Sequence, residues 1–593
     1  MTPNVQLEVE RKYEVPAGAE PDWAALPTLS VVPEATGRDL EAVYFDTPGN
    51  RLASFGIALR RRKGGPDAGW HLKYRDQLGK HELHVPLLKT SDRMPAQMKQ
   101  YVAGLVAGQE LAPLATVVNN RRVLDVQHPD FGRVAEVCLD DVVATDERAG
   151  LQRAWVEYEV ELVNGSGADV GAVFEEIETV LFAAGLTASA SSAKIARALG
   201  ADDDAPAVTV TDLDNNPVGA SKGSDKDGKK KSKKKAGAKK KSKKGTKAAE
   251  DVRADPAAGE PQQTAPESAE DQVWVLINSS VAGLLYADFL LRIGDPEGVH
   301  AVRVAARRLI AVIEGVGPEL AGVSHPELSD QLSALSDHLS AARDAEVVVE
   351  LLPQRAAVVG EQVSSAGLGQ LNALAQTNKE STRAAAVRHL NSAQHLGLLE
   401  ELTQWAESVQ LDPKAREFSA KKIATRAVKR WSKALAQAQA TLESTAEEAA
   451  DSDRPVADPS SEAMSEDVQN PQTPEAAAKI SDAVDLVHVH RKALRNLRYG
   501  LDGLAVTTGL VPKKSWRGLL DGSAQLQTEL SEMMDAAVMD DWFAFAARSL
   551  IRTGGDRYVV GLLHGYERAR VQSYEVRAPE LINRLLSETS PEA

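Results

Sequence analysis

The stretch "VQLEVERKYEV" at residues 5–15 places charged side chains on alternate positions. Glu8, Glu10 and Lys12 would share one face of a β-strand, because successive side chains in a strand point to opposite faces. The leucine and valine between them would lie on the other face. A strand that buries this apolar face therefore turns two carboxylates and one ammonium group to the same side.

The same alternation recurs in "LRRRK" (59–63), "WHLKYR" (70–75), "EVCLD" (136–140) and "EYEVEL" (157–162). In a single strand such a pattern usually marks the solvated face of a half-buried sheet. Here acidic residues lie on the first and last strands and basic residues on several middle ones. A closed antiparallel barrel would collect both signs in its interior. That interior would bind a phosphate chain with a hard divalent cation, because carboxylates ligate Mg²⁺ or Mn²⁺ and arginine and lysine neutralise phosphate.

The chain has 593 residues, too many for one core, so we expect several domains. Residues 1–200 are strand-rich, and residues 272–588 are helical apart from an acidic insertion at 442–478. Residues 201–271 join them and have the composition of a disordered linker. The formal net charge of −16 conceals a lysine-rich segment at 222–247, which carries +12 and leaves −28 for the remainder.

The single cysteine, Cys138, excludes an intramolecular disulfide framework and a cysteine-based zinc site. It is expected to be a small buried residue, and a sequence with a single cysteine fits a reducing cytoplasm. The sequence shows neither a signal peptide nor a run of about 18 apolar residues, so we expect neither secretion nor a membrane span.

"EVERK" at 8–12 resembles the ExExK signature of the CYTH, or triphosphate tunnel metalloenzyme, family. Further segments follow in that family's order, among them "YFDT" (44–47), "RR" (121–122) and "SSAKIARALG" (191–200). The resemblance implies an eight-stranded antiparallel β tunnel with a polar lumen. It also implies that the tunnel cleaves a phosphoanhydride bond of a linear triphosphate with the help of a divalent metal.

The resemblance implies roles for matching residues. The metal-binding carboxylates would be Glu8, Glu10, Glu157 and Glu159. The phosphate-binding and catalytic residues would be Lys12, Arg60, Arg62, Lys73, Arg122, Glu136, Asp140 and Lys194, with Glu82 as a further acid. The resemblance matches Arg122. Because Arg121 and Arg122 are adjacent, a regular strand would turn only one of them inward, and the sequence leaves open which one.

We expect the cations to fix the phosphate chain while Mg²⁺ or Mn²⁺ neutralises developing charge and water attacks the terminal phosphorus. The sequence offers no aromatic box for an organic moiety, since Trp70 is expected to be a core residue. Inorganic triphosphate or short polyphosphate is therefore the favoured substrate. The alternatives are a non-catalytic polyphosphate-binding scaffold and an enzyme, including a cyclase, that acts on an organic triphosphate.

The helical half contains an internal duplication. In "VHAVRVAARRL" (299–309), His300 is followed by arginines at offsets of 3, 7 and 8, and in "VHVHRKALRNLRY" (487–499), His488 is followed by arginine or lysine at offsets of 3, 4, 7 and 10. Offsets of 3, 4 and 7 place side chains on one helical stripe. Each stretch is followed by a related piece, "LSAARDAEV" (339–347) or "LSEMMDAAV" (530–538). Two such helices facing each other across a pseudo-twofold axis would form one basic groove suited to a polyanion.

These segments resemble the CHAD domain, which implies two pseudo-symmetric four-helix bundles that bind inorganic polyphosphate. The polyphosphate-binding residues would be His300, Arg303, Arg307, Arg308, His488, Arg491, Arg495 and Arg498. The lysine-rich segment could capture polyanions without sequence preference, or it could pair with the acidic insertion. We therefore predict an α+β multidomain protein with a CYTH tunnel at 1–200 and a CHAD domain at 272–588. We expect it to be cytoplasmic, and its binding to polyphosphate would locate it on polyphosphate deposits.

Overall fold

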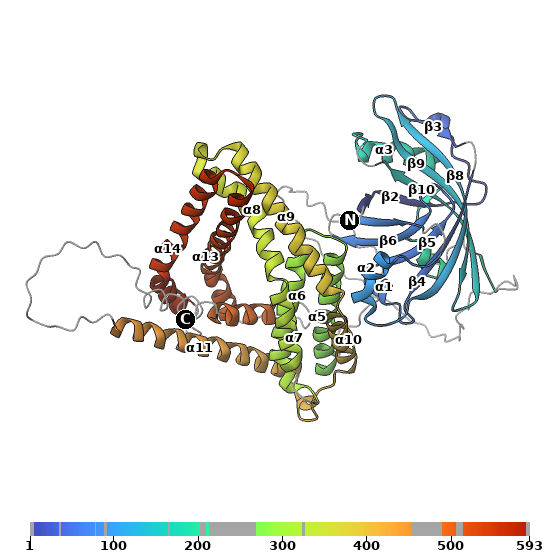
Figure 1. The fold of residues 1–593 in the computed structure, drawn as a ribbon. Coiled ribbons are helices and arrows are strands. Elements are labelled where there is room, and N and C mark those ends of the chain that lie inside the picture. Colours follow the sequence, from blue (N-terminus) through green and yellow to red (C-terminus); the bar gives the residue numbers. More distant parts are fainter. Residues whose placement is uncertain are drawn as a thin grey trace, which may run out of the picture. The chain divides into compact units, whose positions relative to one another are not determined.

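The computed structural model describes residues 5–34, 37–76, 79–87, 92–163, 166–191, 193–201, 209–212, 268–322, 326–452, 489–505 and 514–588. The chain divides into two compact units, one of strands and one of helices (Figure 1). The first consists of Met1–Met98 and Gln109–Gln263, and the second of Lys99–Gly108 and Thr264–Ala593.

The first unit is an antiparallel sheet that closes on itself. Its strands are β1 (Val5–Glu8), β2 (Glu10–Glu14), β3 (Ser30–Pro33), β4 (Arg38–Asp46), β5 (Ala58–Lys63), β6 (Gly69–Asp76), β7 (Gly79–Pro86), β8 (Ala112–His128), β9 (Gly132–Asp146), β10 (Leu151–Leu162), β11 (Thr187–Ala188) and β12 (Thr209–Asp212). The order is β1-β7-β6-β5-β4-β8-β9-β10-β2-β11. Only Val9 separates β1 from β2, so one continuous stretch pairs with β7 at one end and β10 at the other. Counted with β1 and β2 as one interrupted strand, the ring has the eight strands that were predicted.

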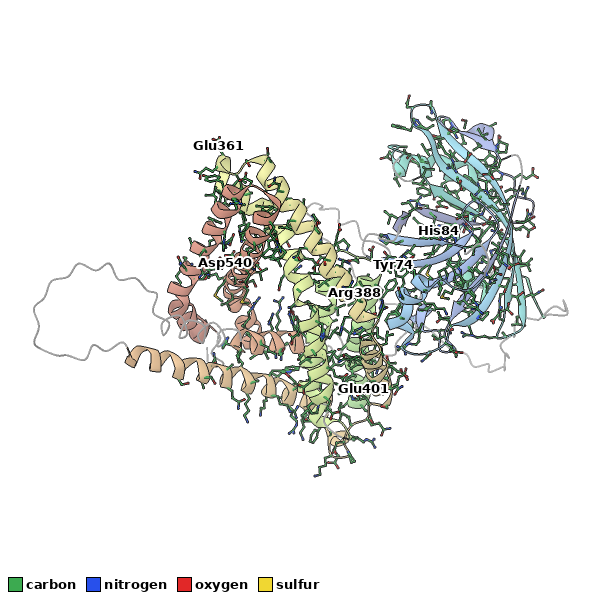
Figure 2. All side chains as sticks on the ribbon, viewed as in Figure 1. Tyr74, His84, Glu361, Arg388, Glu401 and Asp540 are labelled. Atoms are coloured by element: carbon green, nitrogen blue, oxygen red, sulfur yellow. The ribbon has the colours of Figure 1, made fainter. Side chains whose placement is uncertain are left out.

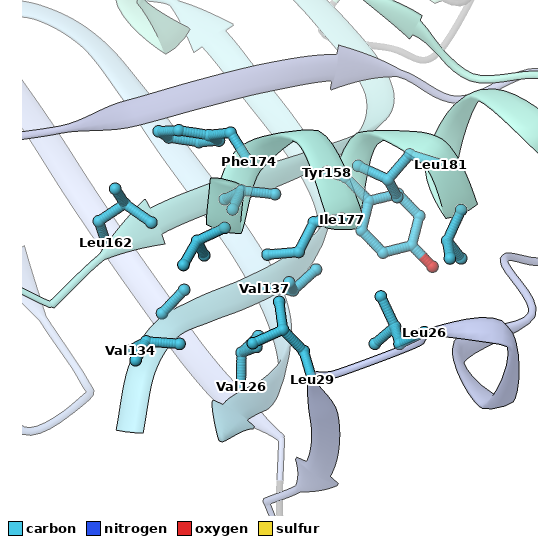
Figure 3. Packing of buried hydrophobic residues seen from close by; sticks show 14 of the residues in the cluster. Leu26, Leu29, Val126, Val134, Val137, Tyr158, Leu162, Phe174, Ile177 and Leu181 are labelled. Atoms are coloured by element: carbon cyan, nitrogen blue, oxygen red, sulfur yellow. The ribbon is translucent and has the colours of Figure 1, made fainter. Parts of the chain in front are cut away.

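The apolar face of the first and last strands packs outward, under α3 (Val170–Ala183). Phe174, Ile177 and Leu181 of this helix share a core with strand residues that include Val137 and Tyr158 (Figure 3). The helix begins at Asp169, whose carboxylate accepts a hydrogen bond from the Ala172 amide at 2.7 Å. Because Tyr158 points outward, its neighbours in "EYEVEL" point into the ring.

The interior of the ring is divided between an apolar and a polar part. The first unit also contains α1 (Arg51–Ser54) and α4 (Lys194–Ala198), whereas α2 (Ala96–Val106) belongs to the second unit from Lys99 onward. A cluster of small and aromatic residues, including Val117, Val142 and Trp155, packs against Ala198 of α4. The predicted polar lumen is therefore confined to the part of the ring that this cluster leaves free.

The second unit is helical. Its helices are α5 (Ala269–Arg292), α6 (Gly298–Val316), α7 (Pro326–His338), α8 (Ser340–Val359), α9 (Ser365–Leu390), α10 (Ala393–Ser408), α11 (Ala420–Ser452), α13 (Lys514–Thr553) and α14 (Arg557–Glu588), and residues 489–505 are also helical. Helices α8, α9, α13 and α14 form a four-helix bundle around one apolar core. The second group contains α5, α6, α7 and α10, with α11 packed on α5 and α6.

One helix, α5, is long and apolar enough to cross a membrane by length and composition alone. Half of its most apolar window is buried by the rest of the helical unit, including Leu276, Leu284 and Phe289. These contacts are those of a core helix in a bundle.

Two boundaries differ from the sequence-based expectation. Residues Thr209–Asp212, placed in the disordered linker, form β12, whose register pairs them with the four residues that begin β10. The helix α11 continues to Ser452 and so enters the segment expected to be an insertion from 442. The lysine-rich segment and residues 453–488 lie outside the described residues. Cys138 is buried, as predicted.

Candidate active site and basic groove

The polar part of the ring encloses a cavity of about 290 Å³. Its acidic lining residues are Glu8, Glu10, Asp67, Glu82, Glu136, Glu159 and Glu161. Its basic lining residues are Lys12, Arg38, Arg60, Arg62, Lys73, Arg121 and Lys194. The ring therefore brings together the carboxylates of the first and last strands and the cations of the middle strands, as the charge alternation predicted.

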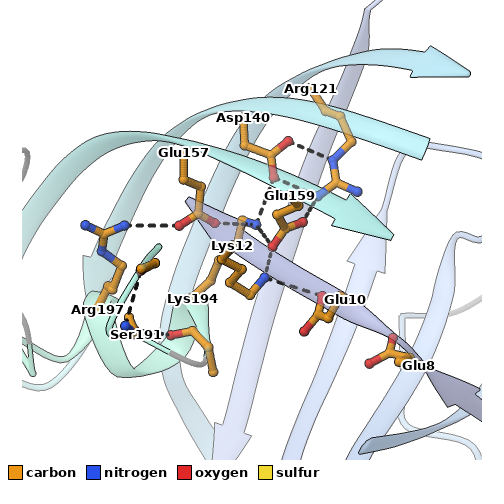
Figure 4. A network of polar contacts seen from close by, with 12 residues as sticks. Glu8, Glu10, Lys12, Arg121, Asp140, Glu157, Glu159, Ser191, Lys194 and Arg197 are labelled. Carbon is orange, nitrogen blue, oxygen red and sulfur yellow. Dashed lines mark hydrogen bonds and ion pairs between the residues drawn. The ribbon is translucent and has the colours of Figure 1, made fainter. Parts of the chain in front are cut away.

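At the inner end of this cavity, three carboxylates meet around one ammonium group (Figure 4). Each of Asp140, Glu157 and Glu159 offers an oxygen within 4.8 Å of the others. The Lys194 ammonium lies 2.8 Å, 2.6 Å and 2.5 Å from these three carboxylates in turn. Such a buried acidic cluster could bind a metal ion, but its charge is already balanced from within the protein.

The pKa values of this inner cluster agree with that balance. Burial works against ionisation, but Lys194 and Lys12 hold the pKa of Glu157 at about 2. Lys194 and Arg121 likewise hold the pKa of Asp140 well below its ordinary value, although burial opposes them. Arg197 and the Trp155 indole both donate to Glu157 as well, at 3.1 Å and 2.9 Å. Asp140 and Glu157 are thus held in their ionised form.

A second group of carboxylates lies nearer to β1, and its members have raised rather than lowered pKa values. Burial raises the pKa of Glu8, and the charges of Glu82 and Glu10 raise it further against the attraction of Lys73. Burial also raises the pKa of Glu161 against the attraction of Lys73, and the charges of Glu8, Glu10 and Glu136 add smaller raising effects. Burial and neighbouring carboxylates therefore both work against ionisation here. A bound divalent cation would gain most from this group, and its all-oxygen donors suit Mg²⁺ or Mn²⁺.

Glu10 connects the two acidic groups. Its pKa lies well below the ordinary value, because Lys12, Lys73 and Lys80 outweigh the effect of burial. Lys80 approaches its carboxylate to 3.1 Å, and the strand register places Glu10 opposite Glu161. Glu10 thus stays ionised between the lysines and the excess carboxylates.

The cations of the middle strands are held by acids that a phosphate chain could replace. Lys73 donates to both carboxylate oxygens of Glu8, at 2.7 Å and 2.9 Å. Arg60 donates to Glu82 at 3.2 Å, and His71 lies 3.0 Å from the same carboxylate. Burial, with Lys194 nearby, lowers the pKa of Lys12 to about 8. The cavity therefore holds several cations whose charges an incoming anion would stabilise.

The choice between the two adjacent arginines is corrected by the structure. Arg121 lines the cavity, and its guanidinium forms a two-pronged contact with Asp140 at 2.7 Å and 2.6 Å, with a further contact to Glu159. Arg122, the residue assigned from the sequence, is exposed and affects Tyr158 on the outer face. The inward position of β8 is therefore Arg121.

Sequence reasoning also missed cavity residues on strands that it had recognised. Glu161 continues the alternation of Glu157 and Glu159, so the sequence pattern indicated an inward position, but Glu161 was not among the predicted site residues. Arg38 precedes the "YFDT" segment on the same strand, two residues before an inward-facing leucine, and lies 3.8 Å from Glu136. Its inward position could have been found only with the β4 register.

In the helical unit, the predicted arginine stripes converge. Burial lowers the pKa of Arg491, and the charge of Arg307 on α6 lowers it further. Burial lowers the pKa of Arg495 to about 10, with added repulsion from Arg307 and Arg491. The Nε atom of Arg495 is buried without a partner among the described residues. We call Arg303, Arg307, Arg491 and Arg495 the basic groove.

The duplication predicted from the sequence is repeated in the contacts. Arg303 donates to the hydroxyl of Ser340 at 2.7 Å, and Arg491 donates to that of Ser531 at 2.9 Å. Each serine precedes the matching aspartate, Asp344 or Asp535, by four residues. The two repeats therefore hold equivalent arginines in the same way.

The remaining predicted groove residues are more exposed. His300 lies at the surface of α6, and partial burial of its ring, together with the charges of Arg343 and Arg307, lowers its pKa. The Arg308 guanidinium lies 5.8 Å from the Tyr499 ring centroid, and Arg498 lies 3.8 Å from Asp502. His488 lies outside the described residues.

Comparison with known proteins gives two family matches within the chain. The CYTH domain model matches residues 6–193, and the CHAD domain model matches residues 276–544. Two uncharacterized proteins from strains of Mycobacterium tuberculosis are 27% and 26% identical over 358 residues. Each match covers 58% of this chain, and the chain spans only 59% of the length of each relative.

Solved structures with similar parts are more distant. The CHAD domain from the plant Ricinus communis is 22% identical and covers 54% of this chain and 92% of its own, with a TM-score of 0.38. PptA from Streptomyces chartreusis is 19% identical, with coverages of 54% and 98% and a TM-score of 0.35. An adenylyl cyclase candidate from Hippeastrum, described as having a dominant triphosphatase activity, is 19% identical, with coverages of 33% and 96% and a TM-score of 0.22.

Proposed function

We propose that this chain, in which a CYTH domain precedes a CHAD domain, hydrolyses inorganic triphosphate or short polyphosphate in the ring and binds longer polyphosphate on the helical unit. CYTH domains are metal-dependent and act on triphosphate substrates. The observation that carries the proposal is the cavity of about 290 Å³, whose lining sets clustered carboxylates against clustered cations. Few ligands other than a metal-bound phosphate chain would satisfy both.

The cations would bind and align the substrate. Arg60 and Arg121 each present a planar fork that matches two phosphate oxygens, while Lys73 and Lys194 act as point charges. They would exchange their present carboxylate partners for phosphate oxygens of the chain. Held in this way, the terminal phosphorus is presented in line to an attacking water.

The carboxylates would hold the metal and receive the proton. Glu8, Glu10 and Glu161 would hold Mg²⁺ or Mn²⁺, which when bound supplies positive charge to the phosphate oxygens. A lining carboxylate that does not ligate the metal would accept the proton from water as its oxygen bonds to phosphorus. The bridging P–O bond breaks, and the shortened phosphate chain leaves with the electron pair.

The cavity lining favours an inorganic substrate. Among the residues described, its one aromatic side chain is Tyr44, whose hydroxyl accepts a hydrogen bond from Arg60 at 3.4 Å. Trp70 is buried in the wall, with its ring 5.2 Å from that of Phe45, so it offers no face to a base or a thiazolium ring. This distinguishes the proposal from hydrolysis or cyclisation of an organic triphosphate.

The helical unit would bind the longer polyanion through the basic groove. Its four arginines come from two repeats, and Arg495 leaves a buried donor for which an anion would be a partner. We further propose that the protein is cytoplasmic and is held on polyphosphate deposits by this groove. The lysine-rich segment would add affinity that depends on salt rather than on chain geometry.

The proposal is tested by a substrate panel. The full chain is assayed with Mg²⁺ against inorganic triphosphate, tetraphosphate, ATP and thiamine triphosphate, with phosphate and cyclic nucleotide both measured. The expected result is that inorganic triphosphate or tetraphosphate has the highest kcat/KM and that no cyclic product forms. Faster turnover of a nucleotide would move the assignment to an organic triphosphate. Tight polyphosphate binding without any turnover would support the alternative of a non-catalytic polyphosphate-binding scaffold.

A further inference from the structure

The cavity of the ring continues into a second hollow at one end. This outer hollow has a volume of about 330 Å³ and is lined by Gln6, Arg133, Glu136, Glu161, Leu162 and Val163. Glu136 and Glu161 line both spaces, and the strand register places them opposite each other on β9 and β10. The outer hollow is therefore the continuation of the cavity past this pair of carboxylates, which we call the mouth.

The other end of the ring is filled by side chains. Ala144 and Trp155 belong to the apolar cluster that includes Ala198 of α4, and Ile195 of the same helix packs against this cluster and lines the cavity. Trp155 and Glu161 lie six residues apart on β10, which is roughly 20 Å along a strand. The cavity between them thus has α4 as its floor and opens toward the outer hollow.

Cations lie along the whole depth of this cavity. Lys194 extends from α4 at the floor, and Lys73 extends from β6, the strand on which Figure 2 labels Tyr74. Arg38 lies 3.8 Å from Glu136 at the mouth. Because a linear phosphate chain carries negative charge on every unit, it would meet a cation at each of these levels.

Arg133 places one more cation beyond the mouth. Its guanidinium donates to a carboxylate oxygen of Asp125 at 2.5 Å and also to Glu136. The register sets Asp125 directly opposite Glu136, so both carboxylates lie on the inner face of the ring. The Arg133 side chain is itself 42% exposed. Its charge therefore faces the outer hollow without being part of the packed wall.

We propose that the ring takes polyphosphate by one end of the chain only, and that Arg133 binds the part of the chain that extends past the mouth. This inference rests on the proposed function and narrows its substrate to the free end of a polyphosphate chain. The terminal phosphate would lie toward Lys194. Arg133 would exchange Glu136 for phosphate oxygens, because a guanidinium fork matches either anion. Arg133 is then the residue that extends the preference from triphosphate to longer chains.

The filled floor also determines how the products leave. Water bonds to the terminal phosphorus, and a lining carboxylate takes its proton. The bridging P–O bond breaks, and its electron pair goes to the shortened chain. The orthophosphate formed in this way lies between that chain and α4, so both products leave through the mouth and the chain is shortened from its end.

The first test compares two arginines at opposite ends of β9. Arg133→Ala should lower the ratio of kcat/KM for medium-chain polyphosphate to kcat/KM for triphosphate by about fivefold, through a higher KM for the longer chain. Arg148 is exposed at the filled end, where it donates to Asn50 and Thr47, and Arg148→Ala should keep this ratio within about twofold. The basic groove is the same in all three full-length proteins. An unchanged ratio in Arg133→Ala would overturn the role of Arg133.

The second test removes the free ends of the substrate. Medium-chain polyphosphate, with both terminal phosphates blocked as amides of a bulky aromatic amine, is incubated with the wild type and MgCl₂ beside the unblocked chain. Gel electrophoresis should show the unblocked chain shortened through intermediates and the blocked chain intact. Cleavage of the blocked chain at a comparable rate would overturn entry by one end.

The proposed function and this inference fail in different ways. If the wild type releases no phosphate from triphosphate, both are overturned. If it hydrolyses triphosphate and also cuts the blocked chain, the proposed function stands and entry by one end is overturned.

Discussion

The Lys73 ammonium lies 2.7 Å from a carboxylate oxygen of Glu8 inside the ring. In the proposed function these two residues serve different ligands, since Glu8 would hold a metal ion and Lys73 a phosphate oxygen. Without a ligand they neutralise each other. Binding of a metal–phosphate complex replaces this one contact by two, so metal and substrate are expected to bind together rather than independently.

The two adjacent arginines of β8 give a direct test of which face lines the cavity. Arg121→Ala should lower kcat/KM for triphosphate about 100-fold, because it removes a preorganised charged donor, whereas Arg122→Ala should stay within about twofold. Arg121→Lys keeps the charge that balances Asp140 but loses the fork, so it should be intermediate and should melt close to the wild type. Equal losses in the two alanine variants would contradict the assignment.

The activity should depend on the charge of Lys12. Its pKa of about 8 means that the lysine is protonated below this pH and loses its charge above it. Because phosphate binding needs the charge, kcat/KM for triphosphate should fall as the pH rises through about 8. Lys12→Arg should lack this fall, since the guanidinium stays charged. An unchanged alkaline limb in the arginine variant would assign the titration to another group.

The excess of carboxylates near β1 should destabilise the protein when no metal is bound. The pKa of Glu161 is raised in the folded state, so the stability linked to it is complete below its unfolded pKa and is lost as the pH rises through the folded pKa. At neutral pH, Glu161→Gln removes a buried charge together with its repulsion by neighbouring carboxylates, and should raise Tm in EDTA.

The same variant should respond less to metal. Mg²⁺ should raise Tm of the wild type, because it binds only the folded protein, and Glu161→Gln should show a smaller rise. Thermal melts of both proteins with and without MgCl₂ measure this difference. A larger Mg²⁺ effect in Glu161→Gln would show that the cation binds the inner carboxylates instead.

The two repeats of the helical unit should contribute equally to polyphosphate binding. Arg303→Ala and Arg491→Ala each remove one charged donor and should weaken binding of long-chain polyphosphate by about tenfold. Ser340→Ala and Ser531→Ala each remove one hydroxyl partner of these arginines and should have smaller, matched effects. Calorimetry with size-fractionated polyphosphate checks this, and an effect confined to one repeat would contradict a shared groove.

The closed ring could be predicted from the sequence because its charge alternation has a period of two residues. In "EYEVEL" the outward residues Tyr158 and Val160 are apolar and form the core under α3, so the direction of the glutamates follows. On β8 this rule fails. Val117 and Arg121 both point inward, because part of the ring interior is an apolar core. Apolar residues therefore do not mark the outer face of that strand, and the choice between Arg121 and Arg122 needs the register with β9.

The division of the cavity carboxylates into two groups could not be predicted from the sequence either. Glu8, Glu10, Glu157 and Glu159 resemble one metal-binding set, but Glu157 lies with Asp140 around the Lys194 ammonium. That arrangement depends on where α4 closes the ring, which no local pattern specifies. The duplication in the helices was readable because two sequences at equal offsets can be compared with each other.

The central claim is tested most directly by phosphate release from inorganic triphosphate with MgCl₂ or MnCl₂, measured for the wild type and Glu8→Gln. We predict release by the wild type that EDTA abolishes and that falls by about 100-fold or more in Glu8→Gln, because a catalytic metal supplies several kcal/mol of charge stabilisation. If the folded wild type releases no phosphate with either ion, or if Glu8→Gln keeps full metal-dependent activity, the ring is not the metal-dependent hydrolytic site proposed above.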